Sequence, residues 1–441
     1  MSFEHGPRVG KSWAGASLAL CAATLAPSCH EPLAPPVEPT QAPATSPPAA
    51  ASSAPAVSHA PSSVVTGATF DEDVAFLSRH GAIKVLSAPN GAQVAISSSY
   101  QARVMTSTLA FGGPSLGFIN RAFIEAGKTG TQFDNYGGED RFWLGPEGGQ
   151  YGLYFPAQQP FSFDHWQTPH GLQEGAWVIT SESPESVTFD RNLSLSNYGK
   201  RAFQVQVERV ISLLSQEQAS ERLGMPIPDG VQWVGFSSTN RLRNEGPDAW
   251  TEASGLLSVW ILGMFAPVPG TRVIVPFDTH AQGEIVNDRY FGKVPADRLR
   301  VVDSGYLLFK CDGQYRSKIG LGPARAKNAL GSYSEPARLL TLVLYTKPKG
   351  AMRYVNSMWE TQKEPYAGDV VNSYNDGPPA PGKPSLGGFY EIESSSPALA
   401  LGPGETTSHE HQTYHFTGPR TALDALARRV LGVALSELPP E

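Results

Sequence analysis

Two glutamates near the C-terminus could exchange protons with a ligand. Glu391 and Glu393 lie in the segment Gly388–Pro397, whose alternation of side-chain types predicts a strand. Residues two apart on a strand share a face, so the two carboxylates would point the same way. A carboxylate at a strand end, held by neighbouring hydroxyl groups, could act as a general base. The alternative is that both side chains lie on a solvated edge strand.

A short loop places two histidines and a tryptophan close together. His165, Trp166 and His170 lie within six residues of the sequence, and Pro169 and Gly171 flank His170. A neutral imidazole can accept or donate a proton at physiological pH, so at least one of the histidines could face a ligand. The alternative is a structural role, which is the more common one for a single histidine. No partner cluster of Cys or His with metal-ligand spacing accompanies the pair, so we expect no zinc site.

A glycine-rich segment supplies a cation beside an aromatic ring. Arg141 and Trp143 lie within residues 135–149, where glycines permit tight turns of the backbone. The guanidinium offers a planar fork of donors and the indole offers a flat apolar face, and sugar recognition needs both. The alternative is a glycine-rich corner whose arginine pairs with a neighbouring acidic residue.

A fourth polar segment, residues 237–246, also has the alternation of a strand. Asn240 and Asn244 would point to one side, whereas Arg241 and Arg243 would point to the other. Only one of these sets can face a cleft, and the other set must then be solvated. The sequence does not tell which set faces the cleft, so Asn240, Arg243 and Asn244 are all candidate ligand-binding residues.

A large scaffold is needed to bring these segments together. The 441-residue chain is 40% hydrophobic and contains 44 glycines and 38 prolines, which favours a turn-rich β protein. Strand-like segments recur along the chain, and residues 203–210 alternate between apolar and polar side chains. Two large facing antiparallel sheets are the natural way to bury so many strands. We predict an all-β domain over residues 67–441, with few short helices, including residues 70–77 and 421–431.

The N-terminal residues have the composition of an export signal followed by a spacer. Two basic residues precede an uncharged, Ala- and Leu-rich stretch, as in a secretory signal peptide over residues 1–29. The last residues of this stretch resemble a bacterial lipobox, which makes Cys29 a candidate for lipidation; cleavage at an Ala-rich site is the alternative. Ala, Pro and Ser make up 21 of residues 31–60, which is typical of an extended linker over residues 30–66. We expect an exported protein of the bacterial cell envelope, membrane-anchored or periplasmic.

The charge balance excludes one class of partner. The formal net charge is −7 and the sequence has no long basic run, so we expect no nucleic-acid binding. We expect a monomer that meets the membrane only through a lipid anchor. Nothing in the sequence calls for a cofactor.

Motifs near the C-terminus follow one another in a recognisable order. Glu393 leaves a strand and is followed by Pro397, the turn Pro403-Gly404-Glu405 and the aromatic strand Tyr414-His415-Phe416. This order resembles the galactose-mutarotase-like, or aldose 1-epimerase-like, superfamily. Short matches in the same order extend over residues 85–417.

The chain also resembles exported bacterial proteins of unknown function that are related to that superfamily. They share segments that resemble Gly137–Trp143 and Val371–Gly377 of this chain. The resemblance implies a β-supersandwich that binds a sugar in a concave sheet. It also implies that a carboxylate takes the proton of the anomeric hydroxyl while a histidine protonates the ring oxygen, without a cofactor.

Carried onto this sequence, the resemblance assigns Glu393 as the base and His170 as the acid or a substrate-binding histidine. The family's second histidine, on the central strand, has no counterpart in residues 240–244. Asparagine cannot donate a proton as an acid, although arginine can stabilise an anionic oxygen. The reaction could therefore be of the epimerase or of the lyase type.

We expect one of two functions for a carbohydrate cleft of this kind. The first is a lipid-anchored enzyme that processes a sugar, and the second is a non-catalytic glycan-binding lipoprotein of the envelope. A purely structural envelope protein is a third possibility. Glu393 and His170 are the candidate catalytic residues. The candidate substrate-binding residues are Arg141, Trp143, His165, Asn240, Arg243, Asn244 and Glu391.

Overall fold

The computed structural model describes residues 67–130, 132–173 and 175–439. The predicted signal peptide with Cys29 and the predicted linker over residues 30–66 lie outside the described residues. Within the described part of the chain, no helix is both long and apolar enough to span a membrane.

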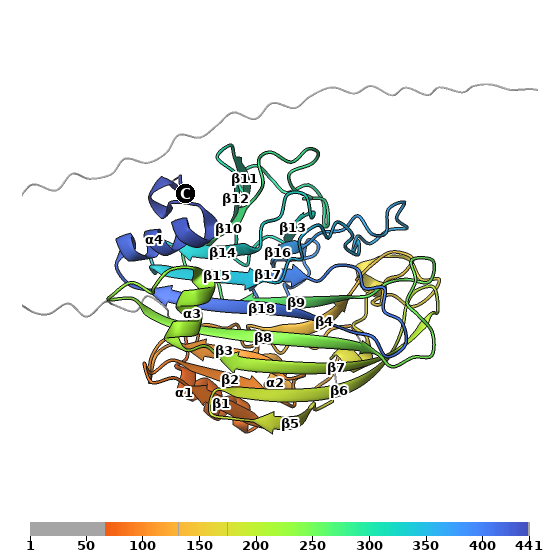
Figure 1. The fold of residues 1–441 in the computed structure, drawn as a ribbon, viewed down its shortest axis with the longest axis horizontal. Helices are drawn as coiled ribbons and strands as arrows, with labels where there is room; N and C mark the ends of the chain where they lie inside the picture. Colours follow the sequence, from red (N-terminus) through yellow and green to blue (C-terminus); the bar gives the residue numbers. More distant parts are fainter. Residues whose placement is uncertain (1–66, 131, 174, 440–441) are drawn as a thin grey trace, which may run out of the picture. The chain divides into compact units, whose positions relative to one another are not determined.

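The described chain forms three antiparallel sheets (Figure 1). In spatial order, the ten-stranded sheet consists of β11 (Leu299–Val302), β12 (Tyr306–Lys310), β10 (Arg272–Pro276), β14 (Ala329–Ser334), β15 (Leu339–Tyr345), β18 (Thr406–Thr417), β8 (Gln232–Asn244), β7 (Ala202–Leu213), β6 (Ser186–Ser196) and β5 (Val178–Glu182). The five-stranded sheet consists of β13 (Ser317–Leu321), β16 (Val371–Asn375), β17 (Tyr390–Ser395), β9 (Ser258–Phe265) and β4 (Arg141–Gly145). The three-stranded sheet consists of β1 (Ile83–Ser87), β2 (Gln93–Ser97) and β3 (Arg103–Thr108). The predicted all-β fold of large antiparallel sheets is confirmed.

The few helices are short. They are α1 (Phe70–Ser78), α2 (Arg121–Ala126), α3 (Gln216–Leu223) and α4 (Arg420–Leu431), with 3-10 turns η1 (Phe163–His165), η2 (His170–Leu172) and η3 (Leu435–Glu437). Thr69 forms a capping box with Glu72 at the start of α1. Leu423 and Leu426 of α4 pack in one apolar cluster with Tyr414 of β18, so this helix covers the outer face of the ten-stranded sheet. The helices predicted over residues 70–77 and 421–431 are both present.

Apolar side chains between the sheets form the core. Strand β7 alternates between buried and more exposed residues along its length, as its sequence predicts. One apolar cluster joins Val273 and Val343 of the ten-stranded sheet to Ile319 and Ile392 of the five-stranded sheet. The three-stranded sheet continues the same layer as the five-stranded sheet, because Val104 forms an isolated bridge with Asp140 next to β4.

Polar side chains also connect the two layers through the interior. The Ser394 hydroxyl of β17 hydrogen bonds to His409 Nε2 and to His411 Nδ1 of β18, each at 2.9 Å. The Glu139 carboxylate lies 2.9 Å from His415 Nε2 of the same strand. All of these side chains are buried, so the two sheets are held by directional hydrogen bonds as well as by apolar packing.

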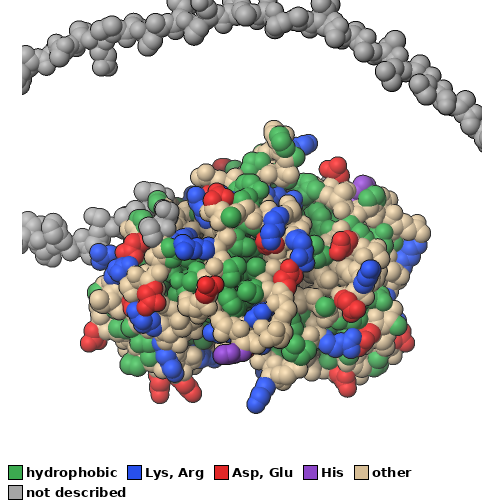
Figure 2. All heavy atoms as spheres, turned by 90° about the horizontal axis from the view of Figure 1, so that it is seen from above, with side chains coloured by type: hydrophobic (Ala, Val, Ile, Leu, Met, Phe, Trp, Pro, Cys, Tyr) green, Lys and Arg blue, Asp and Glu red, His purple; other side chains and the backbone are tan. Residues whose placement is uncertain are grey.

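The outer surface mixes charges of both signs. Figure 2 shows Lys and Arg side chains interspersed with Asp and Glu side chains and with hydrophobic ones. No large patch of one sign dominates that face.

The buried histidines should make the stability of the fold depend on pH. Burial lowers the pKa of His409 to about 3 and the pKa of His411 to about 4, from an ordinary value of 6.5. The unfolded chain therefore binds more protons than the folded chain between these values, and stability falls as the pH drops below about 6.5. We expect a loss of about 1.4 kcal/mol per pH unit for each histidine, measured by urea unfolding.

A double variant isolates this contribution. In H409Q/H411Q the slope of unfolding free energy against pH should flatten between about pH 6.5 and pH 5, whatever the absolute stability of the variant. An unchanged slope in the double variant would show that these histidines are not buried in the neutral form.

Candidate functional site

Chemically active side chains gather on the outer face of the five-stranded sheet. On β17, Tyr390 and Ser394 point inward, since Tyr390 hydrogen bonds to Ser332 of β14 and Ser394 hydrogen bonds to β18. Glu391 and Glu393 must therefore point outward. Residues opposite one another on paired strands share a face. The pairings place the following residues on this outer face: Arg141, Trp143, Trp260, Lys318, Tyr374, Glu391 and Glu393.

A cavity opens on this face, and its unfilled space, together with the solvent at its mouth, is about 490 Å³; we call it the aromatic cavity. Four tryptophans contribute to its lining, together with several Phe and Tyr rings: Trp143, Trp166, Trp260 and Trp359. Five charged side chains also line it: Arg141, Glu147, Arg316, Lys318 and Glu391. The strands provide Arg141, Lys318, Glu391 and some of the rings, whereas Glu147, Arg316 and the remaining rings come from segments between the strands.

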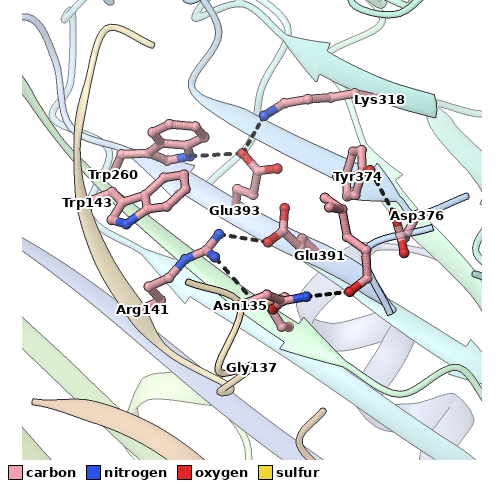
Figure 3. Close-up of polar contacts among 12 residues, drawn as sticks. Asn135, Gly137, Arg141, Trp143, Trp260, Lys318, Tyr374, Asp376, Glu391 and Glu393 are labelled. Atoms are coloured by element: carbon pink, nitrogen blue, oxygen red, sulfur yellow. Dashed lines mark hydrogen bonds and ion pairs between the residues drawn. The ribbon is translucent and has the colours of Figure 1, made fainter. Parts of the chain in front are cut away.

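Arg141 and Glu391 form a buried ion pair in the floor of the cavity (Figure 3). The Arg141 Nη2 atom lies 2.8 Å from Glu391 Oε1, and the two side chains are 2% and 8% exposed. The Arg141 guanidinium also lies over the Trp143 ring, 4.0 Å from its centroid. The arginine therefore pairs with an acid 250 residues away in the sequence rather than with a local partner in a glycine-rich corner.

Glu393 forms a second buried pair beside the first (Figure 3). Lys318 Nζ lies 3.0 Å from Glu393 Oε2, and the Trp260 indole N–H donates to the same oxygen at 2.8 Å. The other oxygen, Oε1, is buried and has no hydrogen-bond partner among the described residues. Because β17 lies between β16 and β9, neither glutamate is on a solvated edge strand.

Burial changes the acidity of the groups around the cavity. It raises the pKa of Glu391 to about 7, although the nearby Arg141 charge works against this shift. It also raises the pKa of Glu147, partly offset by the Lys318 charge. Burial alone would lower the pKa of Lys318, but the charges of Glu393 and Glu147 outweigh it and the pKa is raised. Glu391 can therefore hold or release a proton near neutral pH.

The predicted histidines lie outside the lining of the aromatic cavity. His165 ends η1, and its Nδ1 hydrogen bonds to the Ser162 hydroxyl at 2.8 Å. His170 begins η2 and is exposed, and it lines a separate open cleft together with Asn192 and Ser194 of β6. The structure therefore does not bring His170 into the cavity that Glu391 lines.

The predicted polar residues of β8 have other surroundings. The alternation is as expected, since Asn240 and Asn244 are buried and Arg243 is exposed. Asn240 Oδ1 accepts a hydrogen bond from Arg209 at 2.6 Å, and Asn244 Nδ2 donates to the Leu401 carbonyl at 3.0 Å. Arg243 pairs with Glu245 at 3.1 Å. None of these three candidates lines the aromatic cavity. The buried asparagines hydrogen bond to other groups of the protein, and the Arg243 side chain is exposed.

The sequence patterns do not point to several of the residues that line the cavity. These residues are Trp260, Lys318, Glu147, Arg316 and Trp359. Lys318 offered a signal, since a lysine in the middle of the strand Ser317–Leu321 requires a partner if the strand is buried. Within the described residues, no group of three or more His, Cys, Asp or Glu could hold a metal ion.

Comparison with known proteins gives one family and several structural neighbours. The sequence model of a family of unknown function (DUF6786) matches residues 68–440. No curated protein matches the chain.

The similar solved structures include three bacterial proteins. One is a candidate aldose 1-epimerase from Escherichia coli, 14% identical with a TM-score of 0.46, covering 76% of this chain and 98% of that one. A protein from Synechocystis is 11% identical with a TM-score of 0.46, covering 76% and 96%. A galactose mutarotase-like protein from Lactobacillus casei is 11% identical with a TM-score of 0.41, covering 76% and 100%. Galactose-mutarotase-like and aldose 1-epimerase-like proteins are thus structural neighbours, as the resemblance predicted.

The pair of Lys318 and Glu393 should be important for stability. Replacing Lys318 with methionine leaves a buried carboxylate without its counter-ion, so we expect the free energy of unfolding to fall by about 3–5 kcal/mol. Urea unfolding measures the loss. The double variant K318M/E393Q, which removes both charges, should recover a large part of it.

An exposed lysine provides the control. Lys310→Met lies on the surface and should change stability by less than about 0.5 kcal/mol. If K318M and K318M/E393Q lose the same stability, the two side chains do not act as a pair.

Proposed function

We propose that this chain, which belongs to a family of unknown function (DUF6786), binds a saccharide in the aromatic cavity and transfers protons to and from that sugar. The observation that carries this proposal is the joint placement of tryptophans and paired charges on one sheet face. Indole faces pack against the C–H surfaces of a sugar ring, and fixed charged groups hydrogen bond to its hydroxyls.

Glu391 and Glu393 supply the chemistry in this proposal. Lys318 and Trp260 hold Oε2 of Glu393 in place, which leaves Oε1 to accept a proton. Glu391 has a pKa of about 7, so a substantial fraction of it carries a proton at neutral pH. Two neighbouring carboxylates in different environments are a common arrangement for a base and an acid.

The proposed reaction opens and recloses a sugar ring. Glu393 takes the proton of the anomeric hydroxyl, the bond from the anomeric carbon to the ring oxygen breaks, and protonated Glu391 donates its proton to that oxygen. Rotation of the carbonyl group and the reverse steps give the other anomer and restore both carboxyl groups. Glu391 thereby takes the role that the family resemblance gave to a histidine, since His170 lies outside the cavity.

Binding without turnover is the second candidate function. The central strand carries no histidine between Asn240 and Asn244, and His170 lines another cleft. A protein that retains the aromatic cavity without a competent acid would hold a glycan and leave it unchanged.

We further propose that the protein is an exported monomer of the cell envelope, anchored through Cys29. The composition of residues 1–66 supports this proposal.

Removal of either carboxylate charge tests the enzymatic proposal. In E393Q and in E391Q, we expect the rate of anomer interconversion to fall by at least about 100-fold, because glutamine cannot exchange the proton. Sugar affinity should change much less. Polarimetry or NMR on a panel of reducing sugars measures the rate, and calorimetry measures the affinity.

The control is Glu125→Gln, because Glu125 is exposed on α2 and its replacement should change neither the rate nor the affinity.

The pH dependence of the rate gives a further test. With the wild-type protein, the rate should fall as the pH rises above about 7, because Glu391 then loses the proton it donates. Binding without any turnover would support the glycan-binding alternative, and absence of binding to every sugar would end both proposals.

The proposed anchor has a separate test. Cys29→Ser should move the protein from the membrane fraction to the soluble fraction and abolish its labelling by a radioactive fatty acid, because the serine cannot accept the lipid. The matched control is Cys21→Ser, which precedes the proposed cleavage site. Unchanged labelling of C29S would rule out this cysteine as the anchor.

A further inference from the structure

Arg316 is the third cation of the aromatic cavity, and its surroundings differ from those of the other two. Its guanidinium carbon lies 3.6 Å from the centroid of the Phe291 ring, 5.4 Å from that of Phe163 and 5.8 Å from that of Trp359. The side chain is half-buried among these rings. A guanidinium stacked on aromatic faces keeps its N–H groups available along its edges.

No acidic residue of the described chain neutralises Arg316. Its Nε atom is buried without a hydrogen-bond partner, and it forms no ion pair among the described residues. The other two cavity cations are each paired, Arg141 with Glu391 and Lys318 with Glu393. Removing an arginine from water without a counter-ion is unfavourable, and stacking on rings offsets only part of that cost.

The carboxylates of this region have other neighbours. Glu391 pairs with Arg141, and Glu147 interacts with the charge of Lys318. Asp376 accepts hydrogen bonds from the Tyr374 hydroxyl at 3.0 Å and from the backbone N–H groups of Gly387 and Gly388 at 2.9 and 2.8 Å. Figure 3 shows the bond between Asp376 and Tyr374. Because no carboxylate of the described residues pairs with Arg316, its guanidinium is available to an anion that a ligand brings.

We infer that the saccharide held in the aromatic cavity carries an anionic substituent, and that Arg316 receives it. This inference rests on the proposed function, since it names the substrate class of the same site. A carboxylate, as in a uronic acid, matches the planar fork of a guanidinium, and a phosphate ester offers the same type of oxygen acceptors. Arg316 lies two residues before Lys318, so the anionic end of the sugar points toward the β13 side of the cavity.

Paired sugars that differ only in this group test the inference. Calorimetry compares D-galacturonate with D-galactose and D-glucuronate with D-glucose, and adds glucose 6-phosphate and inorganic phosphate. For the wild-type protein, we expect at least one anionic sugar to bind about 10-fold or more tightly than its neutral parent. Raising the salt concentration should weaken that binding more than the binding of the neutral sugar.

Variants of Arg316 assign the preference to this side chain. R316Q should abolish the preference for the anionic sugar and leave the affinity for the neutral sugar within about threefold, whereas R316K should keep part of the preference. The matched control is R353Q, because Arg353 also lies over an aromatic ring, Tyr366, but on the exposed surface outside the cavity. Thermal unfolding confirms that each variant is folded.

Each outcome decides a different point. Tighter binding of glucose 6-phosphate than of either uronate, lost in R316Q, supports the inference with a phosphate ester as the anion. Neutral sugars that bind as well as anionic ones, or a preference that survives in R316Q, overturn the inference and leave the proposed function standing. If no sugar binds to the wild-type protein, or if only inorganic phosphate binds, both the inference and the proposed function fail.

Discussion

The two-residue period of β17 is the constraint on which both the core and the candidate site depend. Tyr390, Ile392 and Ser394 point into the interior, whereas Glu391 and Glu393 point to the opposite face of the sheet, where Glu391 lines the aromatic cavity and Glu393 pairs with Lys318. A shift of one residue in the pairing of this strand would place both carboxylates in the apolar interior and the core residues in the cavity. The hydrogen bonds from Ser394 to β18 resist such a shift, so the packing of the two layers fixes the orientation of the site.

Charge pairing makes it possible to bury so many ionisable groups in one place. Arg141 and Lys318 come from opposite edge strands of the five-stranded sheet, β4 and β13, and each pairs with a glutamate of β17, which lies between them. Each pair satisfies a charge that would be costly to bury alone. Arg316 has no such partner in the part of the chain that the structure describes, so it is the cavity cation most suited to meet a charged ligand.

Sequence reasoning predicts the local pattern of this protein better than its long-range partners. Alternation of residue types predicts the strands, and it correctly separates Asn240 from Arg243. Alternation does not show which face meets the other sheet, so the buried asparagines resembled cleft residues. The ion pair of Lys318 with Glu393 joins residues 75 positions apart, and it depends on the order of strands across the sheet. No local pattern contains that order.

The residues that line the aromatic cavity come from two kinds of segment, strands of the sheet and the segments that connect strands. Arg141, Lys318 and Glu391 belong to strands that also hold the core together. The rings of Phe163, Trp166, Phe291 and Trp359 come from segments between the strands, as do Glu147 and Arg316. Loops tolerate insertions and replacements that strands in a sheet do not. Exchange of these loops alone would therefore change the selectivity for a ligand among proteins with this architecture, while the paired charges of the strands stay in place beneath them.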